Sequence, residues 1–369
     1  MGGAGLRKES VARYALGMDY RALMSGQRRG LAATLLRAGL WFGSLFYGLA
    51  VRVRNRRYDA GKLPIERMEV PVISIGNLTT GGTGKTPLVC LLAKRLRERG
   101  VRVSLVSRGY GRGEASSNDE ALELEQRLPD VPHVQDPDRV AAATVAVEEL
   151  ETQLVLMDDG FQHRRLHRDL DILVIDATCP FGYGALLPRG MLREPLSSLA
   201  RADIAVLSRS NYVSQAERTR IRDEALQYHP QLLWLEAEHR PSVLVNHRQQ
   251  EMPLSSLQGQ NVLAFCGIGN PAAFARTVRD CGAKLVDLKA LPDHAKYDAP
   301  TMRELQRWSE ELASQHSVDR IVCTQKDLVK IRVAQIGRLP VQAIQVDLQI
   351  GDEQPLWQRI ERLLSNETP

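Results

Sequence analysis

Residues 70–99 read VPVISIGNLTTGGTGKTPLVCLLAKRLRER, and this stretch decides the fold. Its first residues, 70–75, form a short apolar run rich in β-branched side chains, which predicts a buried parallel strand. A glycine-rich segment follows. From Pro87 onward apolar residues recur at helical spacing, and proline suits the first turn of a helix. A strand, a glycine-rich loop and a helix in this order are the context of the Walker A phosphate-binding motif.

The predicted phosphate loop has the residue types that triphosphate binding needs. Glycines allow backbone N–H groups to point at phosphate oxygens, and a helix N-terminus adds positive potential. Lys85 would reach the β- and γ-phosphates, and the Thr86 hydroxyl would ligate Mg²⁺. The strict motif begins with glycine where this chain has Thr79, so an ordinary glycine-rich turn is the alternative. The predicted ATP-binding residues are Thr79, Thr80, Gly81, Gly82, Thr83, Gly84, Lys85 and Thr86.

A second apolar run ends in two acidic residues. Residues 153–157 read QLVLM, and Asp158 and Asp159 follow directly. An apolar strand that ends in aspartate is the Walker B arrangement, whose carboxylate holds Mg²⁺ directly or through water. One aspartate could ligate the metal while the other orients its water shell; a plain turn is the alternative. The predicted metal ligands are Thr86, Asp158 and Asp159.

Further apolar runs predict the rest of a sheet. Strands are expected at residues 101–106, 172–175 and 204–207, with helices between them. This alternation predicts an α/β fold of the P-loop NTPase type, with a doubly wound, mostly parallel sheet and a site at the carboxyl ends of its strands. A fresh strand at residues 262–268 begins a smaller C-terminal α/β domain. The expected units are a helical segment at 1–60, a P-loop core at 61–235, a proline-punctuated linker at 236–260 and the smaller domain at 261–369.

The bulk composition is that of a folded globular protein. The chain has 369 residues, enough for two domains of roughly 100–200 residues each. Its net charge of +5 is mild and predicts no nucleic-acid partner. The five cysteines have no metal-site spacing, which indicates reduced, mostly buried thiols in a cytosolic setting.

The N-terminal region contains a long apolar stretch at residues 31–53. A helix of this length would span roughly 35 Å, enough to cross a bilayer core, although Arg37 interrupts it near its start. Trp41, Tyr47 and flanking arginines favour a membrane helix. A signal peptide and a buried core helix are the alternatives, and the sequence leaves open whether the helix spans the membrane or lies in its interface.

Several blocks together resemble one family. Residues 73–87, ISIGNLTTGGTGKTP, resemble the signature of the tetraacyldisaccharide 4'-kinases, which are the lipid A 4'-kinases. The other blocks occur in family order. They are SRGYG at 107–111, DDGFQHRRLHRDLDILVIDA at 158–177, FGYGALLPRGMLREP at 181–195, PDH at 292–294 and TQKD at 324–327.

The resemblance implies an activity and a location. ATP would phosphorylate the 4'-hydroxyl of a tetraacylated glucosamine disaccharide 1-phosphate, giving lipid IVA in lipopolysaccharide biosynthesis. The enzyme would be a monomer that works on this glycolipid at the cytoplasmic face of a bacterial inner membrane, which it contacts through its N-terminal helix. The implied fold is a P-loop core with a smaller C-terminal α/β domain.

The resemblance also implies catalytic residues, which join Lys85. Asp119, in a block where the family has G-D-E, would be the catalytic base, paired with His294. Such a pair can accept the proton of the sugar hydroxyl as its oxygen attacks. The chain departs from the family pattern at Asn118, which stands for glycine, and at Gln325, which stands for glutamate.

The block at 181–195 departs from the family pattern as well. It has Met191 and an extra arginine, Arg189. Arg189 and Arg193 could meet the phosphate of the substrate.

Two other functions fit a P-loop. A nucleotide-gated membrane switch would need N-K-x-D for guanine recognition, but Lys326 and Asp327 are adjacent, and Met157 occupies the aspartate position of D-x-x-G. A P-loop kinase for a soluble metabolite would not explain the apolar N-terminal stretch. A structural protein that has lost activity is a third reading, against which the complete set of catalytic residue types argues.

Overall fold

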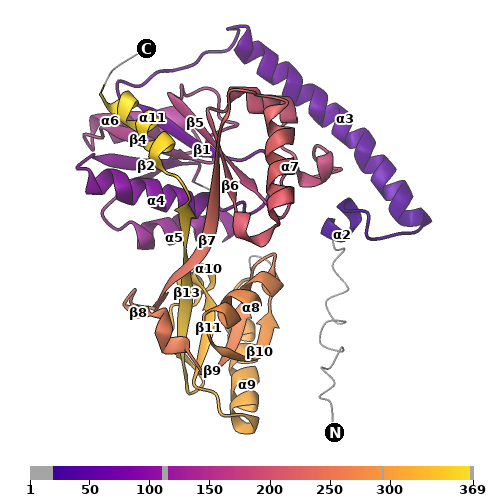
Figure 1. Ribbon diagram of the computed structural model, residues 1–369, viewed down its shortest axis with the longest axis vertical. Coiled ribbons are helices and arrows are strands. Elements are labelled where there is room, and N and C mark those ends of the chain that lie inside the picture. Colours follow the sequence, from indigo (N-terminus) through magenta and orange to yellow (C-terminus); the bar gives the residue numbers. More distant parts are fainter. Residues whose placement is uncertain (1–19, 110–114, 293–294, 366–369) are drawn as a thin grey trace.

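The computed structural model describes residues 20–109, 115–292 and 295–365. Two lobes share one 13-stranded sheet, and they lie one above the other in Figure 1. Along the sheet the strands follow the order β10-β9-β11-β13-β7-β6-β5-β1-β4-β2-β3, with β12 paired to β13 and β8 paired to β7.

The larger lobe is a doubly wound, mostly parallel sheet, so the predicted fold class is confirmed. β1 lies at its centre, between β4 and β5, and pairs with both in parallel. The strands are β1 Val72–Gly76, β2 Val103–Ser107, β3 His133–Gln135, β4 Leu154–Asp158, β5 Leu170–Asp176 and β6 Ile204–Ser208.

Alternating side chains of these strands build a core on each face of the sheet. Ile73 and Ile75 pack on one face beneath α4, α5 and α11, whereas Val72 packs on the other face beneath α6. α7 covers the same face of the sheet as α6 and packs there through Ile221. These helices are α4 Lys85–Glu98, α5 Ala115–Arg127, α6 Arg139–Glu148, α7 Gln215–Leu226 and α11 Gln354–Leu364.

The smaller lobe repeats the layered arrangement around three parallel strands. α8 packs on one face of the sheet through Phe274 and Val278, and α9 and α10 pack on the other face through Leu305 and Leu328. The elements are β9 Asn261–Cys266, β10 Lys284–Ala290, β11 Arg320–Thr324, α8 Pro271–Asp280, α9 Ala299–Gln315 and α10 Gln325–Ile331.

Two long antiparallel strands, β7 Leu233–Val245 and β13 Leu339–Ile350, run through both lobes (Figure 1). The segment 236–260 is therefore not an irregular linker, as the prolines suggested. It carries most of β7, the short strand β8 Glu251–Pro253 and a turn of 3₁₀ helix at Leu254–Leu257. Pro241 is tolerated because it lies where the β7–β13 register shifts, between Gln345 and Val346, and an irregularity of this kind is where a strand accepts proline.

The C-terminal segment also differs from the expected division. α11 leaves the smaller lobe and packs on the larger one, where Leu356, Trp357 and Ile360 join the same core cluster as Ile73. Residues 261–365 therefore contribute to both lobes.

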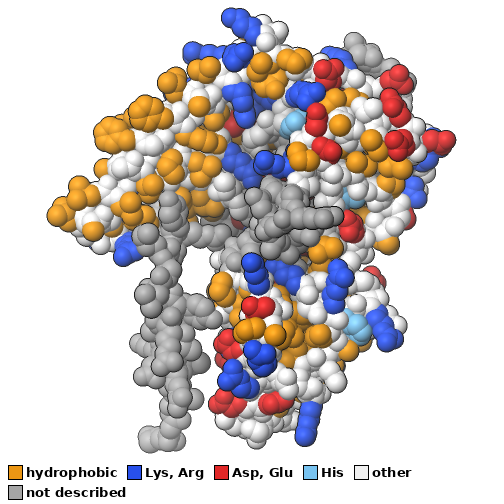
Figure 2. Space-filling model, turned by 180° about the vertical axis from the view of Figure 1, so that it is seen from behind, with side chains coloured by type: hydrophobic (Ala, Val, Ile, Leu, Met, Phe, Trp, Pro, Cys, Tyr) orange, Lys and Arg blue, Asp and Glu red, His pale blue; other side chains and the backbone are white. Residues whose placement is uncertain are grey.

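The N-terminal segment forms α2 Tyr20–Met24 and the long helix α3 Leu31–Asp59, which runs along the outside of the larger lobe (Figure 1). By length and composition α3 could cross a membrane. Most of its exposed side chains before Arg52 are apolar: Phe46, for example, is 75% exposed. Figure 2 shows these hydrophobic side chains gathered along the ridge that α3 forms.

Candidate functional site

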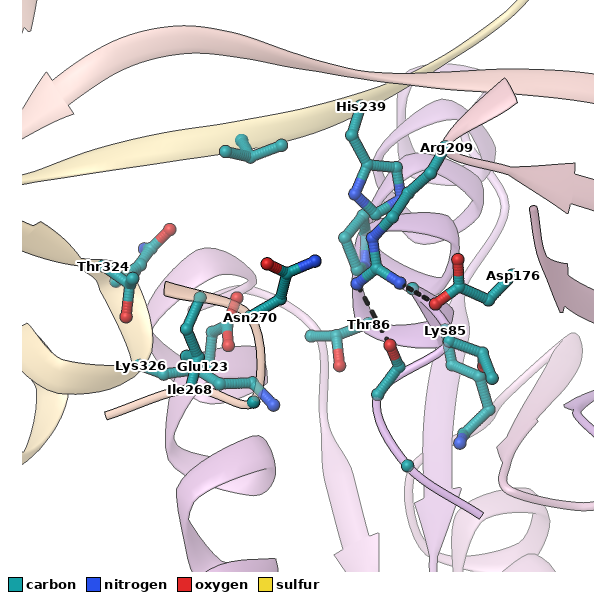
Figure 3. A pocket seen from close by; sticks show the side chains of 18 of the residues that line it. Lys85, Thr86, Glu123, Asp176, Arg209, His239, Ile268, Asn270, Thr324 and Lys326 are labelled. Carbon is teal, nitrogen blue, oxygen red and sulfur yellow. Dashed lines mark hydrogen bonds and ion pairs between the residues drawn. The ribbon is translucent and has the colours of Figure 1, made fainter. Parts of the chain in front are cut away.

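A cavity of about 540 Å³ lies where the carboxyl ends of the parallel strands meet the smaller lobe. All eight predicted ATP-binding residues line it, together with Asp158 and Asp159. Asn270, Thr324 and Lys326 contribute from the smaller lobe (Figure 3). Gln325 also lines the cavity. The fold thus brings the two predicted phosphate-site motifs into one cavity, as adjacent strands of a parallel sheet require.

The phosphate loop is held by its own side chains and its neighbours. Asn77 Nδ2 donates to Thr83 Oγ1 at 3.1 Å, and Ser208 Oγ donates to the Thr83 carbonyl at 2.5 Å. Gly81 and Gly84 have φ of 102° and 93°, a conformation that favours glycine. Thr79 instead forms an antiparallel bridge with Leu192 and has no positive φ, so glycine is not required at this position.

A cluster of three charges stands at the loop. Lys85 Nζ lies 3.4 Å from Asp159 Oδ1, and Arg193 Nη1 donates to both Asp159 oxygens at 2.9 and 2.8 Å. Burial alone would raise the pKa of Asp159, but Lys85 and Arg193 outweigh it and lower this pKa to about 2. Asp159 is therefore a carboxylate at any physiological pH, and it holds both cations in the cavity.

The oxygen atoms that could hold Mg²⁺ also line this cavity. Thr86 and Asp158 are buried, and one oxygen of Asp158 accepts the backbone N–H of Asp159 at 3.0 Å. Among the described residues no group of three or more His, Cys, Asp and Glu side chains forms a metal site. Hydroxyl and carboxylate oxygens are the ligands that Mg²⁺ prefers, and it usually completes its shell with phosphate oxygens and water. The donor set fits such a partly protein-held Mg²⁺.

Sequence reasoning missed a second set of residues that supports the loop. Arg209, directly after β6, pairs with Asp176 at the end of β5 and donates to the Gly82 carbonyl at 3.0 Å (Figure 3). His239 of β7 approaches the loop at Gly84, since a Cβ on Gly84 would lie only 2.7 Å from its Nε2. Burial, with help from nearby arginines, lowers the pKa of His239 to about 3, so its ring is neutral. The position of Asp176 at the end of a predicted strand could have indicated a site residue. The roles of Arg209 and His239 depend on contacts between distant parts of the chain, which the sequence does not show.

The segment 182–194 connects the cavity with α3. Met191 and Arg193 line the cavity. From the other side of the same segment, the Ser44 hydroxyl donates to the Leu186 carbonyl at 2.9 Å, and the Tyr47 hydroxyl donates to the Arg193 carbonyl at 2.9 Å. The long N-terminal helix is therefore hydrogen-bonded to a wall of the site.

Glu194 completes this connection. Its carboxylate is fully buried and accepts hydrogen bonds from Asn55 at 2.8 Å, Ser198 at 2.9 Å, Arg201 at 2.9 Å and Arg54 at 3.3 Å. Asn55 and Arg54 belong to α3, whereas Ser198 and Arg201 belong to a 3₁₀ helix at Leu196–Arg201. A buried charge is stable in such a place only because several donors compensate it.

The TQKD block lies at the wall of the smaller lobe. Asp327 is fully buried and accepts hydrogen bonds from the Thr324 and Tyr297 hydroxyls, both at 2.6 Å, and from the backbone N–H of Gly267 at 3.1 Å. Burial raises its pKa despite these hydrogen bonds. Asp327 thus joins the loops after β9, β10 and β11 into one support.

The remaining predicted residues are placed only in part. Asp119 belongs to α5, but its side chain and the whole of His294 lie outside the described residues. Arg193 lines the cavity. Arg189 points away, because its guanidinium donates to the Met24 carbonyl at 3.0 Å.

Comparisons with known proteins agree with the motifs. The family described as LpxK, tetraacyldisaccharide-1-P 4'-kinase, matches residues 36–365. A tetraacyldisaccharide 4'-kinase of Geobacter sulfurreducens is 36% identical over 365 residues, which cover 94% of this chain and 98% of that protein. One of Anaeromyxobacter sp. (strain Fw109-5) is 35% identical, with 92% and 95% covered.

A solved structure agrees as well. The crystal structure of LpxK from Aquifex aeolicus in complex with ATP superposes with a TM-score of 0.71 at 31% identity, covering 89% of this chain and 99% of that one. The resemblance that the sequence blocks indicated is confirmed, and this chain belongs to the tetraacyldisaccharide-1-P 4'-kinase family.

Proposed function

We propose that this protein transfers the γ-phosphoryl group of ATP to the 4'-hydroxyl of a tetraacylated glucosamine disaccharide 1-phosphate, giving lipid IVA in lipid A biosynthesis. The observation that carries the proposal is the cluster of Lys85, Asp159 and Arg193 in a cavity whose wall is hydrogen-bonded to an apolar helix. This arrangement unites a phosphate site with a lipid-facing element. The ATP complex of the Aquifex relative supports the choice of nucleotide.

The residues of the loop would bind and orient the triphosphate. Backbone N–H groups of residues 81–86 would surround the phosphates, and Lys85 would neutralise the charge on the transferred group. Arg193 already stands beside Lys85 and would meet the same group or the phosphate of the acceptor. Asp159 keeps both cations in place until phosphate oxygens compete for them.

Thr86, Asp158 and Asp159 are the residues that would hold Mg²⁺. When bound, Mg²⁺ would supply positive charge that offsets the negative charge developing on the transferred phosphoryl group. Asp119, with His294, is our proposed acceptor of the hydroxyl proton, and its support is the resemblance of the two blocks to the family pattern.

The same evidence supports a place at the membrane. One side of α3 is bonded to the larger lobe through Ser44, Tyr47 and Asn55, while its other side exposes apolar residues. A helix that crosses a bilayer has lipid around it, so this two-sided character favours a helix that lies in the interface. We propose that a monomer docks in this way on the cytoplasmic face of the inner membrane. Exposed arginines near the end of α3, such as Arg52 and Arg56, would meet anionic head groups.

The test is a transfer assay in detergent. Purified protein is incubated with γ-labelled ATP and the tetraacylated disaccharide 1-phosphate, and we expect the label in the lipid fraction. A matched acceptor that lacks the 4'-hydroxyl should remain unlabelled. ATP hydrolysis without lipid labelling would instead indicate the nucleotide-gated switch, and labelling of soluble sugars alone would indicate a kinase for another substrate.

A further inference from the structure

The backbone of Arg193 is hydrogen-bonded on both of its sides. Its N–H donates to the Leu78 carbonyl at 2.7 Å, and its carbonyl accepts from the Tyr47 hydroxyl at 2.9 Å. Leu78 directly precedes the phosphate loop, whereas Tyr47 belongs to α3. The residue whose guanidinium reaches the cavity is therefore held by the phosphate loop from one direction and by the N-terminal helix from the other.

The face of α3 that carries Tyr47 also holds the segment that leads to Arg193. A Cβ on Gly48 would lie 2.8 Å from Leu186 Cδ1, so glycine at this position allows α3 to approach the segment closely. One turn earlier in the helix, Ser44 Oγ accepts the backbone N–H of the residue at 189 at 3.0 Å. The contact with Tyr47 is thus part of a close fit between α3 and this wall of the cavity.

The guanidinium of Arg193 is in a place where its exact position matters. Its Nη1 lies 2.9 and 2.8 Å from the two oxygens of Asp159, a carboxylate that Lys85 also contacts at 3.4 Å. A charged donor accelerates phosphoryl transfer only if it already stands where the charge develops. The long side chain of arginine can take many rotamers, so the place of its guanidinium depends on how firmly its backbone is held.

Tyr47 can be changed without disturbing the sealed charges nearby. Glu194 is also held by α3, but its loss would leave buried cations without their acceptor. Tyr47 instead contacts the main chain of Arg193 itself, through one oxygen atom that bears no charge. Removing this oxygen acts on the position of Arg193 and leaves the charge of every side chain as it was.

We propose that Tyr47 is a positioning residue for phosphoryl transfer, which places the Arg193 guanidinium by holding the Arg193 carbonyl. The inference rests on the proposed function, in which Arg193 meets the transferred phosphoryl group or the phosphate of the acceptor. Both ligands present phosphate oxygens to the guanidinium. The helix that we propose lies on the membrane would thus also supply part of the geometry of the phosphate site.

A double-mutant cycle tests this role. Tyr47→Phe removes only the hydroxyl, and we expect kcat/KM in the labelled-ATP assay to fall about three- to tenfold, the usual size for one hydrogen bond between uncharged groups. In an Arg193→Ala background the same change should alter kcat/KM less than about twofold, because no guanidinium remains to be placed. Tyr58→Phe is the matched control on the same helix: it keeps the ring that faces Arg164, and kcat/KM should stay at the wild-type value.

Thermal stability separates positioning from a purely structural role. Arg193→Ala keeps the backbone carbonyl, so the lost hydrogen bond should lower the thermal midpoint equally in both backgrounds. The loss of kcat/KM should appear in only one of them. The same fold-loss of kcat/KM with and without the guanidinium would show that Tyr47 merely stabilises the fold, and it would overturn the inference. An unchanged kcat/KM for Tyr47→Phe in the otherwise wild-type chain would overturn it as well.

The kinetic constants of Tyr47→Phe identify the phosphate that Arg193 meets. A raised KM for ATP indicates the triphosphate, a raised KM for the lipid indicates the phosphate of the acceptor, and a lowered kcat alone indicates a contact formed only in the transition state. Each of these results supports the positioning role, provided that it disappears in the Arg193→Ala background.

The two proposals fail separately. A wild-type protein that labels no lipid would refute the proposed function. Affinities for ATP and for the disaccharide lipid, measured by calorimetry, would then decide the role of Tyr47. A loss of affinity for either ligand in Tyr47→Phe that disappears in the Arg193→Ala background supports the role, and equal affinities of wild type and Tyr47→Phe for both ligands overturn it.

Discussion

Asp159 and Glu194 form the same kind of ion-pair cluster in two different environments, one beside the cavity and one in the interior. Each carboxylate lies between two cations: Asp159 between Lys85 and Arg193, and Glu194 between Arg54 and Arg201. Asp159 is 31% exposed and borders the cavity, whereas Glu194 is completely buried and has two further donors. The Asp159 cluster, which we call the open cluster, can exchange one of its partners for substrate phosphate. The Glu194 cluster, which we call the sealed cluster, has no access to substrate, so it stabilises the fold.

The two clusters are joined by consecutive residues. Arg193 reaches into the cavity and Glu194 reaches toward α3. One dipeptide therefore connects the phosphate site with the helix that we propose lies on the membrane. Four changes test how far the contrast between open and sealed clusters holds.

Breaking the open cluster at its cation should have the largest effect. We expect Lys85→Ala to lower kcat about 10³-fold, because charge stabilisation dominates phosphoryl transfer. Thermal stability should change little, since Lys85 borders a cavity. Lys94→Ala, an exposed lysine of the same helix, is the matched control and should keep wild-type turnover. Near-normal turnover of Lys85→Ala in the labelled-ATP assay would remove the phosphate-loop assignment.

Breaking the sealed cluster should act on stability. Glu194→Ala leaves the buried Arg201 and Asn55 without their acceptor, and we expect a loss of about 3 kcal/mol in the free energy of unfolding. Denaturant titration measures it. Glu217→Ala removes an exposed ion pair with Arg220 and should leave the free energy of unfolding nearly unchanged. Similar small losses for both variants would show that Glu194 does not anchor α3.

The proton acceptor that we propose belongs to neither cluster. Asp119→Ala should lower kcat about 10²-fold and leave the affinity for ATP nearly unchanged, because a general base acts on the acceptor hydroxyl. Asp130→Ala, which removes an exposed pair with Arg97, is the control. Parallel losses in turnover and in ATP affinity would argue for a role in nucleotide binding instead.

The smallest effect concerns pH. The folded protein lowers the pKa of Asp159 from 3.8 to about 2, so its ionised form stabilises the folded state above pH 4, and this contribution is lost as the pH falls toward 2. We expect about 1–2 kcal/mol, since the side chain is partly exposed. Unfolding free energies of wild type and Asp159→Asn should converge by that amount between pH 5 and pH 2. A constant difference over this range would contradict the pairing.

Much of this site could be predicted because its parts are local in the chain. Residue type and spacing predict the strand, loop and helix around Lys85, and they also predict the strand that ends at Asp158. The place of the site then follows from the rule that ligands bind at the carboxyl ends of parallel strands.

The rest depends on pairing between distant residues, which no local pattern records. From the sequence alone Glu194 looks like an ordinary surface acid, and only the position of α3 in the fold shows that it is buried and hydrogen-bonded. The strand β7 was hidden because Pro241 interrupts its pattern, and only the register shift opposite it explains why the strand continues. The burial of Gln325 is equally invisible, since burial is a property of the folded chain.

The return of α11 to the larger lobe has a consequence for how the protein is made. Ribosomes release a chain from its N-terminus onward, and domains generally fold as units once they emerge. Here Leu356, Trp357 and Ile360 belong to the core that surrounds the phosphate-loop strand. The larger lobe must therefore wait, with part of its apolar surface uncovered, until the smaller lobe has been translated.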